Sequence, residues 1–296
     1  MKIIGIDIGG TTIKADLYDD LGTSLNQFKE IETIIDYDLG TNQILNQVCD
    51  LIGEYILNYS IDGVGISTAG VVNANTGEII YAGYTIPGYI GVNFTSEIEK
   101  RFGLSTFVEN DVNCAALGEL WMGQAKDKKN VVMVTIGTGI GGSIIVNGKI
   151  VNGFNYTAGE VGYIPVGNSD WQSKASTTAL IHLYQKKSLK TNQTGRTFFT
   201  DLSSGDKVAK ETFEIFVENL TKGLLTISYL LNPEILILGG GILAKKDILL
   251  PEIQSSLAKN AMDNRFLPNN VVAATLGNEA GRIGAVKNFL DRISNK

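Results

Sequence analysis

The chain has 296 residues, of which 25 are basic and 31 acidic, and its formal net charge is −6. Hydrophobic residues account for 44% of the chain and charged residues for 19%, which excludes a disordered polymer and predicts one large globular domain or two ordinary ones. Because the small negative charge is spread along the chain, we expect neither a nucleic acid nor an anionic membrane as the main partner.

The first predicted elements are two strands joined by a glycine turn. Residues 2–8 form an apolar, β-like run, and residues 13–18 alternate between apolar and polar as a hairpin partner would. Apolar residues then recur at helical spacing over 41–58. The pattern further predicts a strand within 24–32, strands at 62–67, 78–81 and 106–109, and helices at 94–102 and about 113–122.

A second unit of the same kind follows the charged segment 126–129. A strand at 131–136, a glycine loop and a partner strand at 143–146 repeat the arrangement of residues 3–18. Two similar units in one chain indicate two lobes of related design with a cleft between them. The remaining predicted elements are helices near 176–187 and 206–231, a strand at 235–238 and a last helix from about residue 281.

The first glycine turn lies in Asp7-Ile8-Gly9-Gly10-Thr11-Thr12-Ile13-Lys14. The glycines allow the backbone to approach a polyphosphate, and the threonine hydroxyls and amides can bond its oxygens. Asp7 is placed to hold Mg²⁺ through water. Taken alone, the same residues also suit an ordinary hairpin turn.

The second glycine turn lies in Thr135-Ile136-Gly137-Thr138-Gly139-Ile140-Gly141-Gly142. Residues 137–142 match Gly-x-Gly-x-x-Gly, which indicates dinucleotide binding only where it opens a helix. Because the following Ser143-Ile144-Ile145-Val146 is β-like, we reject that interpretation and predict a second phosphate hairpin. The chain contains no P-loop sequence Gly-x-x-x-x-Gly-Lys-Ser/Thr.

Two further segments follow the ends of predicted strands. Glu109-Asn110-Asp111-Val112-Asn113 places polar side chains where a hydroxylic substrate could bind, with Asp111 as candidate general base and Asn110 as hydroxyl ligand. The alternative is that Asp111 caps the following helix. Gly239-Gly240-Gly241 suits a flat ring such as adenine against the backbone, although a simple turn also explains it.

In order and spacing, these segments resemble the ROK family of sugar kinases and repressors from end to end. Asp7-x-Gly-Gly-Thr-x-x-Lys is similar to the first phosphate motif of the family, and Ile136-Gly-Thr-Gly-Ile-Gly-Gly to the second. Glu109-Asn-Asp-x-Asn resembles the catalytic motif and Gly239-Gly-Gly the adenosine motif. Gly159-Glu160-Val-Gly162 resembles the sugar motif Gly-Glu-x-Gly-His.

The resemblance implies an α/β protein with the ribonuclease-H-like, two-lobed actin/hexokinase fold and a central cleft. The N-terminal lobe would comprise residues 1–116 with a returning C-terminal helix at 282–296, and the C-terminal lobe residues 117–281.

The implied activity is ATP-dependent, Mg²⁺-assisted phosphorylation of the 6-hydroxyl of a glucose-type ring, with Asp111 as the base. The implied ATP-binding residues are Asp7, Gly9, Gly10, Thr11, Thr12, Lys14, Thr135, Gly137, Thr138, Gly139, Gly239, Gly240 and Gly241. The implied sugar-binding residues are Gly70, Asn110, Asp111, Glu160, Tyr163 and Gln172.

The chain departs from the family pattern at one place. The family has a histidine that contacts both a structural zinc and the sugar near its anomeric carbon, and this chain has Tyr163 there. The zinc cysteines are missing from residues 164–176, and Gln172 stands where the family has a carboxylate that reaches the anomeric hydroxyl. We therefore expect no zinc site, and we expect His182, the single histidine, on a helix surface.

These replacements bear on the substrate. An aromatic ring and a neutral amide suit a substituted anomeric oxygen better than a free hydroxyl. A zinc-free subgroup of the family with Gly-Glu-x-Gly-Tyr phosphorylates β-glucosides such as cellobiose, so we predict a β-glucoside kinase in which Tyr163 stacks on the second sugar. The alternative is a glucokinase or N-acetylmannosamine kinase that acts on a free hexose.

Two non-enzymatic functions fit less well. A non-catalytic sugar sensor has little need of a base and two phosphate loops. A repressor of the family would carry a helix-turn-helix domain ahead of the first phosphate motif. Here that motif already begins at Asp7, so we do not expect DNA binding of this kind.

The expected partners are a sugar, either a β-glucoside or a hexose, and copies of the same chain in a homodimer or homotetramer, as is common in the family. Cys49 and Cys114 are the only cysteines, so no disulfide framework is expected. The chain shows neither a signal peptide nor an apolar run of membrane-spanning length, and we expect a cytoplasmic protein.

Overall fold

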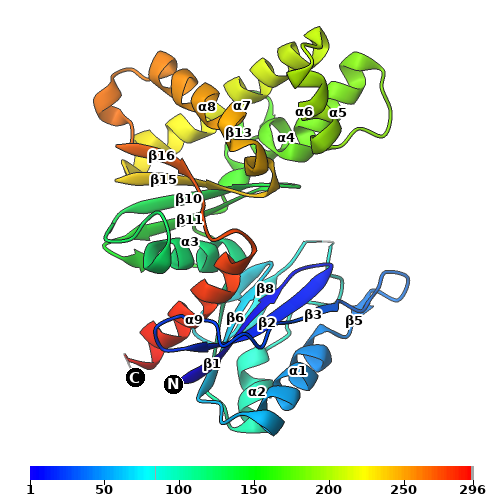
Figure 1. Ribbon diagram of the computed structural model, residues 1–296, viewed down its shortest axis with the longest axis vertical. Helices are drawn as coiled ribbons and strands as arrows, with labels where there is room; N and C mark the ends of the chain where they lie inside the picture. The colour runs from blue at the N-terminus through cyan, green and yellow to red at the C-terminus, as the bar shows by residue number, and fades with distance from the viewer. Residues whose placement is uncertain (84, 295–296) are drawn as a thin grey trace. The chain divides into compact units, whose positions relative to one another are not determined.

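The structure is a computed structural model that describes residues 1–83 and 85–294, so residues 295 and 296 of the predicted C-terminal helix lie outside the described residues. The chain divides into two compact units (Figure 1). Unit 1 comprises residues 1–126, 152–157 and 276–296, and unit 2 comprises residues 127–151 and 158–275.

Unit 1 is built on a five-stranded sheet with the strand order β3-β2-β1-β6-β9. Its strands are β1 (Lys2–Ile8), β2 (Thr12–Asp19), β3 (Lys29–Glu32), β6 (Gly63–Thr68) and β9 (Thr106–Asn110). The first three strands pair antiparallel, whereas β6 and β9 run parallel to β1. Two short ribbons pair β4 (Ile35–Asp36) with β5 (Thr41–Asn42) and β7 (Val71–Asn73) with β8 (Glu78–Tyr81).

Helices pack on both faces of this sheet. They are α1 (Ile44–Asn58), α2 (Phe94–Phe102), α3 (Asp111–Met122) and α9 (Ala280–Ile293), and a short 3₁₀ helix (Gly277–Glu279) precedes α9. Because side chains alternate along a strand, Ile4 and Ile6 of β1 join the core with α1 and α2, whereas Ile3 packs with α9. The last helix, red in Figure 1, thus lies beside the first strand, drawn in blue.

Glycines allow α9 to pack this closely. A methyl group at Gly65 of β6 would lie 2.2 Å from the backbone oxygen of Ala285, and one at Gly284 would lie 1.6 Å from the backbone oxygen of Cys114 on α3. No side chain fits at such distances, so the glycines are required by the packing rather than by a turn.

Unit 2 repeats the design with a sheet in the order β12-β11-β10-β15-β16. Its strands are β10 (Val131–Ile136), β11 (Ile140–Val146), β12 (Lys149–Ile150), β15 (Ile235–Gly239) and β16 (Asn270–Ala273), and a ribbon pairs β13 (Pro165–Val166) with β14 (Ser169–Asp170). Its helices are α4 (Gln172–Ala175), α5 (Thr177–Ser188), α6 (Gly195–Ser203), α7 (Lys207–Leu231) and α8 (Lys246–Asn260), with 3₁₀ helices at Val161–Tyr163, Gly241–Lys245 and Asn264–Phe266.

Most predicted elements are present. The pattern did not predict helices α4, α6 and α8, strand β16, or the short strands β4, β5, β7, β12, β13 and β14. Helix α8 buries only Leu249, Ile253 and Leu257 and contains Pro251, so its apolar stripe is too narrow to read as a helix. Strand β3 begins at Lys29 and helix α1 at Ile44, later than the predicted ranges. No helix within the described residues is both long and apolar enough to cross a membrane.

Candidate functional site

The first glycine turn connects β1 to β2 and is held by backbone hydrogen bonds. The N–H of Gly9 donates to the oxygen of Thr12 at 2.9 Å, which closes the turn. Thr33, which follows β3, makes two further hydrogen bonds to the turn. Its hydroxyl donates to the backbone oxygen of Gly10 at 2.8 Å, and its N–H donates to the oxygen of Thr11 at 2.9 Å. The residues predicted to bind phosphate therefore form a fixed backbone frame.

Asp7 lies near the end of β1, directly opposite Ser67 of β6. The Ser67 hydroxyl donates to Asp7 Oδ1 at 2.6 Å. Burial raises the pKa of the Asp7 carboxyl, and the hydrogen bond from Ser67 and the charges of Arg282 and Lys14 offset part of this rise. A methyl group at Gly281 would lie 2.6 Å from Asp7 Oδ1, so a larger residue there would displace the Asp7 carboxylate. A buried carboxylate of this kind fits a hydrated Mg²⁺, since a cation would offset the cost of burying its charge.

Lys14, the last residue of the first motif, lies on β2 opposite Asp7. Its ammonium group is 3.8 Å from Glu30 Oε1 on β3. The pair is partly exposed, so it holds Lys14 only weakly in that position.

The predicted catalytic segment, residues 109–113, lies at the carboxyl end of the same sheet. Ser67 pairs with Glu109, and Thr68 pairs with Asn110, in the parallel register of β6 and β9. The neighbouring strands β1, β6 and β9 therefore end at the same edge. This edge brings together Asp7, Asn110 and Asp111, which the sequence places about 100 residues apart.

Asn110 connects two parts of that edge. Its side-chain nitrogen Nδ2 donates to the backbone oxygen of Gly70 at 3.0 Å. Its Oδ1 accepts from the backbone N–H groups of Val112 at 2.9 Å and Asn113 at 3.1 Å. Gly70 adopts a φ of 98°, and a methyl group there would lie 2.6 Å from the backbone oxygen of Tyr81. The two predicted sugar ligands Gly70 and Asn110 are thus bonded to each other.

Asp111 is the first residue of α3 and is half-buried. Its Oδ1 accepts from the N–H of Val112 at 2.9 Å. The capping role considered for Asp111 belongs mainly to Asn110, whose side chain accepts from two N–H groups of the helix.

Glu109 belongs to the candidate site, although the sequence pattern assigned it no role of its own. Its side chain is 2% exposed. One carboxylate oxygen accepts from the N–H of Asn110 at 2.8 Å and from Nδ2 of Asn113 at 3.0 Å, and the other accepts from Nδ2 of Asn152 at 3.0 Å. Glu109 therefore fixes segment 152–157 of unit 1 to the catalytic segment, a contact that no local pattern could reveal.

The second glycine turn, in unit 2, lies against the start of α5. The N–H of Gly137 donates to the oxygen of Gly139 at 3.0 Å, and the oxygen of Gly137 accepts from the N–H of Thr177 at 2.9 Å. Thr138, which the pattern placed in the phosphate motif, is the residue at the tip of this turn.

The glycines after β15 lie directly beside that turn. Thr135 of β10 pairs with Gly239 of β15 in the parallel register. Gly240 has a φ of 94°, and a methyl group there would lie 2.2 Å from the backbone oxygen of Ile136. The second phosphate motif and the adenosine motif thus meet at the carboxyl ends of adjacent strands.

A cavity of about 770 Å³ opens beside these two segments, within unit 2. Residues of α5, α6 and the connection between them form much of its lining, together with Gly137, Thr138, Gly241 and Lys245. Its volume is that of a typical small-molecule site. His182 is exposed on α5, as expected, and it also lines this cavity, which its sequence context did not indicate.

The predicted sugar motif of unit 2 surrounds the 3₁₀ helix Val161–Tyr163. Glu160 is exposed, and Tyr163 is 57% exposed as a residue. Gln172 begins α4, and its Oε1 would lie 2.6 Å from a methyl group at Gly139 and 3.2 Å from one at Gly162. Gln172 therefore lies between the sugar motif and the second glycine turn.

Within residues 1–83 and 85–294, no group of three or more His, Cys, Asp and Glu side chains is arranged to hold a metal ion. Cys49 and Cys114 are both buried and free.

The two sheets, each with a glycine turn in its first hairpin, define an α/β protein of the ribonuclease-H-like actin/hexokinase class, and comparison with solved structures confirms the predicted fold class. A ROK family protein from Streptococcus pneumoniae in complex with sucrose has a TM-score of 0.87 at 28% identity, with 100% of both chains covered. A ROK family glucokinase from Streptomyces griseus in complex with glucose and AMPPNP has a TM-score of 0.79 at 27% identity, with 97% of this chain and 98% of that chain covered.

The sequence pattern that defines the ROK family matches residues 3–292, and the chain belongs to that family. A β-glucoside kinase of Listeria monocytogenes is 32% identical in an alignment of 303 positions that covers 98% of each chain. The relatives of this chain thus include sugar kinases with different named substrates.

Proposed function

We propose that this chain is an ATP-dependent sugar kinase that phosphorylates the 6-hydroxyl of a glucose-type ring, with a β-glucoside such as cellobiose as its preferred substrate. The observation that carries the kinase proposal is the cavity of unit 2, whose lining includes Gly137 and Thr138 of the second glycine turn and Gly241. Glycine backbone beside a cavity suits a nucleoside triphosphate, because amides can approach the phosphates while the base lies in the cavity. The relative solved with AMPPNP supports ATP as the donor.

The acceptor half of the reaction is assigned to the edge of unit 1. Asp111 takes the proton of the 6-hydroxyl while that oxygen forms a bond to the γ-phosphorus, and the bond from the γ-phosphorus to the bridging oxygen of ADP breaks. Asn110 and Gly70 orient the sugar, and their mutual hydrogen bond keeps that arrangement fixed before the sugar binds. When bound, Mg²⁺ held through water by Asp7 would neutralise charge on the phosphate oxygens.

The β-glucoside preference rests on Tyr163 and Gln172. Tyr163 is 57% exposed as a residue, so its ring is available to stack on a second sugar. Gln172 offers a neutral amide where a carboxylate would suit a free anomeric hydroxyl. The similarity to a β-glucoside kinase over 98% of both chains supports this choice. The second candidate is a kinase for a free hexose, which is favoured by the similarity to a glucokinase solved with glucose.

A sugar panel tests the proposal. ADP release is followed with ATP and Mg²⁺ on cellobiose, gentiobiose, glucose and N-acetylmannosamine. We expect a β-glucoside to give the highest kcat/KM and to carry the new phosphate on the 6-hydroxyl of its non-reducing ring. A preference of about tenfold or more for glucose or N-acetylmannosamine would support the free-hexose kinase instead. If no sugar stimulated ADP release, the protein would be a non-catalytic sensor.

A further inference from the structure

Residues 191–200, which connect α5 to α6 and form most of α6, contribute part of the lining of the cavity in unit 2. Four of them line it: Gln193, Gly195, Arg196 and Phe199. Leu189, just before this lining segment, has a φ of 58°. A leucine adopts such a left-handed conformation only where neighbouring contacts hold it. The contacts around the start of the segment therefore decide how it lies against the cavity.

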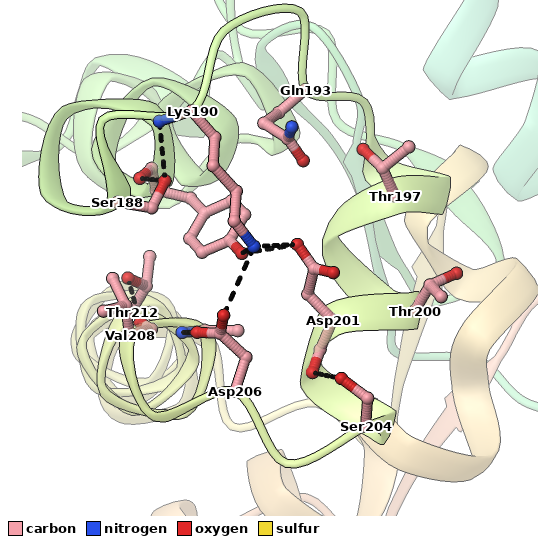
Figure 2. Close-up of polar contacts among 12 residues, drawn as sticks. Ser188, Lys190, Gln193, Thr197, Thr200, Asp201, Ser204, Asp206, Val208 and Thr212 are labelled. Carbon is pink, nitrogen blue, oxygen red and sulfur yellow. Dashed lines mark hydrogen bonds and ion pairs between the residues drawn. The ribbon is translucent and has the colours of Figure 1, made fainter.

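Lys190 joins the two ends of the lining segment. Its ammonium group donates to Asp201 Oδ2 at 2.7 Å and to Asp206 Oδ2 at 3.3 Å, and Figure 2 shows it between these two carboxylates. Lys190 directly precedes the lining segment and Asp201 directly follows it, so this ion pair closes the segment into a loop. Because a closed loop has fewer conformations than an open one, the pair restricts the movement of the lining residues.

Tyr184 fastens the same ion pair to α5. Its ring is fully buried and packs edge to face against Phe198 of α6, with the ring centroids 5.1 Å apart. Its hydroxyl donates to Asp201 Oδ2 at 2.6 Å and accepts from the Lys190 ammonium group at 2.9 Å. A rigid, buried side chain therefore sets the distance between the ion pair and α5.

Asp206 brings a third helix to the same ammonium group. Its side chain caps α7 by accepting from the N–H of Ala209 at 2.9 Å. Tyr184, Lys190, Asp201 and Asp206, which we call the Lys190 clasp, thus join α5, α6 and the start of α7. The hydrogen bonds to Asp201 and Tyr184 raise the pKa of Lys190, so its ammonium group stays charged at neutral pH.

The charge of Lys190 is needed where it lies. Oδ2 of Asp201 and Oδ2 of Asp206 both contact the same nitrogen, so without it two carboxylates would face each other and repel. The ion pairs are partly exposed, and pairs of this kind contribute little to global stability. Phe198 is fully buried and keeps α6 in the core. Loss of Lys190 should therefore loosen the lining segment locally rather than unfold unit 2.

We propose that Lys190 positions the lining segment for the phosphate donor, and so sets the affinity for the donor rather than the rate of phosphate transfer. This inference rests on the proposed function, which assigns the donor to the cavity of unit 2. Lys190 itself does not line that cavity, so it acts through residues 191–200 as a positioning residue. A segment that adopts its binding form only part of the time lowers the apparent affinity by that fraction.

The substitution Lys190→Met tests this, because methionine lacks the charge and has a similar length. We expect the KM for ATP to rise about tenfold, while kcat at saturating ATP and the KM for the sugar stay near their wild-type values. The affinity for ADP, measured by calorimetry without sugar, should fall by about the same factor. Amide hydrogen exchange should become faster in residues 191–196 and stay the same in the sheet of unit 2.

Two further variants separate the charge of Lys190 from its packing. Lys190→Arg keeps a cation and should hold the KM for ATP within about threefold of the wild type. Adding Asp206→Asn to Lys190→Met removes the repulsion between the carboxylates, and asparagine can still cap α7, so part of the ATP affinity should return.

Lys187→Met is the matched control. Lys187 of α5 lies 3.4 Å from Glu211 of α7, in a partly exposed ion pair whose members both lie outside the lining segment. Its loss should change neither the KM for ATP nor the affinity for ADP.

Several outcomes would overturn the inference. One is an unchanged KM for ATP together with an unchanged ADP affinity in Lys190→Met. Equal rises in KM for ATP and sugar, or the same rises in Lys187→Met, would show a general structural role instead. If Lys190→Met does not fold, Asp201→Asn weakens the same ion pair from α6 and must also raise the KM for ATP.

Failure of the proposed function would look different. If no sugar were phosphorylated, that function would be rejected, and the ADP affinities of the wild type and Lys190→Met would still decide whether Lys190 positions a nucleotide site. If the wild-type protein did not bind ADP, both proposals would be rejected.

Discussion

The side-chain amide of Asn110 donates to the backbone oxygen of Gly70 at 3.0 Å, while its oxygen accepts from the N–H groups of Val112 and Asn113. One side chain thus fixes the loop after β6 and the start of the helix that begins with Asp111. The position of the proposed base is therefore coupled to that of a proposed sugar-binding loop.

Asn110→Ala should reduce both stability and activity. Losing the helix cap costs about 1–2 kcal/mol in the free energy of unfolding, and kcat should fall by roughly tenfold or more because Asp111 and Gly70 lose their common support. Chemical denaturation and steady-state kinetics measure the two effects.

Asn93→Ala is the matched control, since Asn93 caps α2 through a hydrogen bond from Ser96 at 2.9 Å. It should cost about 1 kcal/mol of stability without changing kcat, and an equal loss of kcat in both variants would contradict a specific role for Asn110.

Asp111→Asn should remove the base while leaving the fold and sugar binding intact. Aspartate and asparagine are both compatible with the first turn of a helix, so the thermal unfolding midpoint should change little. In contrast, kcat should fall ~10²–10⁴-fold. Sugar affinity measured by calorimetry should stay close to that of the wild type. A variant that retains more than about a third of wild-type kcat would show that Asp111 is not the base.

Asp7→Asn should stabilise the protein at neutral pH while it abolishes activity. Because burial raises the pKa of Asp7, the folded state binds this proton more tightly than the unfolded state, and the stability contribution of Asp7 declines as pH rises through the folded pKa. Asparagine has no charge to bury and can still accept from Ser67. The unfolding free energy of Asp7→Asn should therefore exceed that of the wild type by almost nothing at about pH 3, which is below the pKa of Asp in the unfolded state. The difference should be largest at pH 7.

Denaturation with urea at both pH values, in EDTA and without nucleotide, measures this difference. Asp38→Asn, at an exposed position, serves as the control and should show the same small change at each pH. An Asp7→Asn variant that is less stable than the wild type at pH 7 would contradict the expected cost of the buried charge.

Tyr163→Ala should narrow the preference for a disaccharide mainly by harming the disaccharide. Stacking of a sugar on the ring is worth about 1 kcal/mol, which corresponds to a several-fold change in kcat/KM. We therefore expect cellobiose to lose several-fold and glucose to change little. Equal losses for both sugars would mean that Tyr163 contacts the reacting ring, and a larger loss for glucose would favour the free-hexose kinase.

Zinc should be absent from the purified protein and unnecessary for activity. Residues 164–176 contain neither cysteine nor histidine, and Tyr163 replaces the family histidine, so the usual zinc ligands are missing. Elemental analysis of protein purified without added metal measures the content. Stoichiometric zinc, or activity lost to a zinc-selective chelator with Mg²⁺ in excess, would refute this prediction.

The sequence alone was sufficient for the fold class and for the segments of the candidate site. Glycine turns, apolar strands and the polar residues after them are local features, because they depend on backbone freedom and on side-chain alternation within a few residues. Asp7, Asp111 and Gly239 could each be selected on those grounds. Elements with weak apolar stripes, such as α8, could not, because only tertiary packing stabilises them.

The contacts between those segments were decided by the tertiary structure. The pairing of Thr135 with Gly239 and the bond between Asn110 and Gly70 join residues 104 and 40 positions apart, and no local pattern encodes such distances. The cavity beside the second glycine turn likewise forms only because α5, α6 and that turn come together in the folded chain. Sequence periodicity specifies which face of an element is buried, whereas a side chain's hydrogen-bond partners depend on which distant elements pack against it.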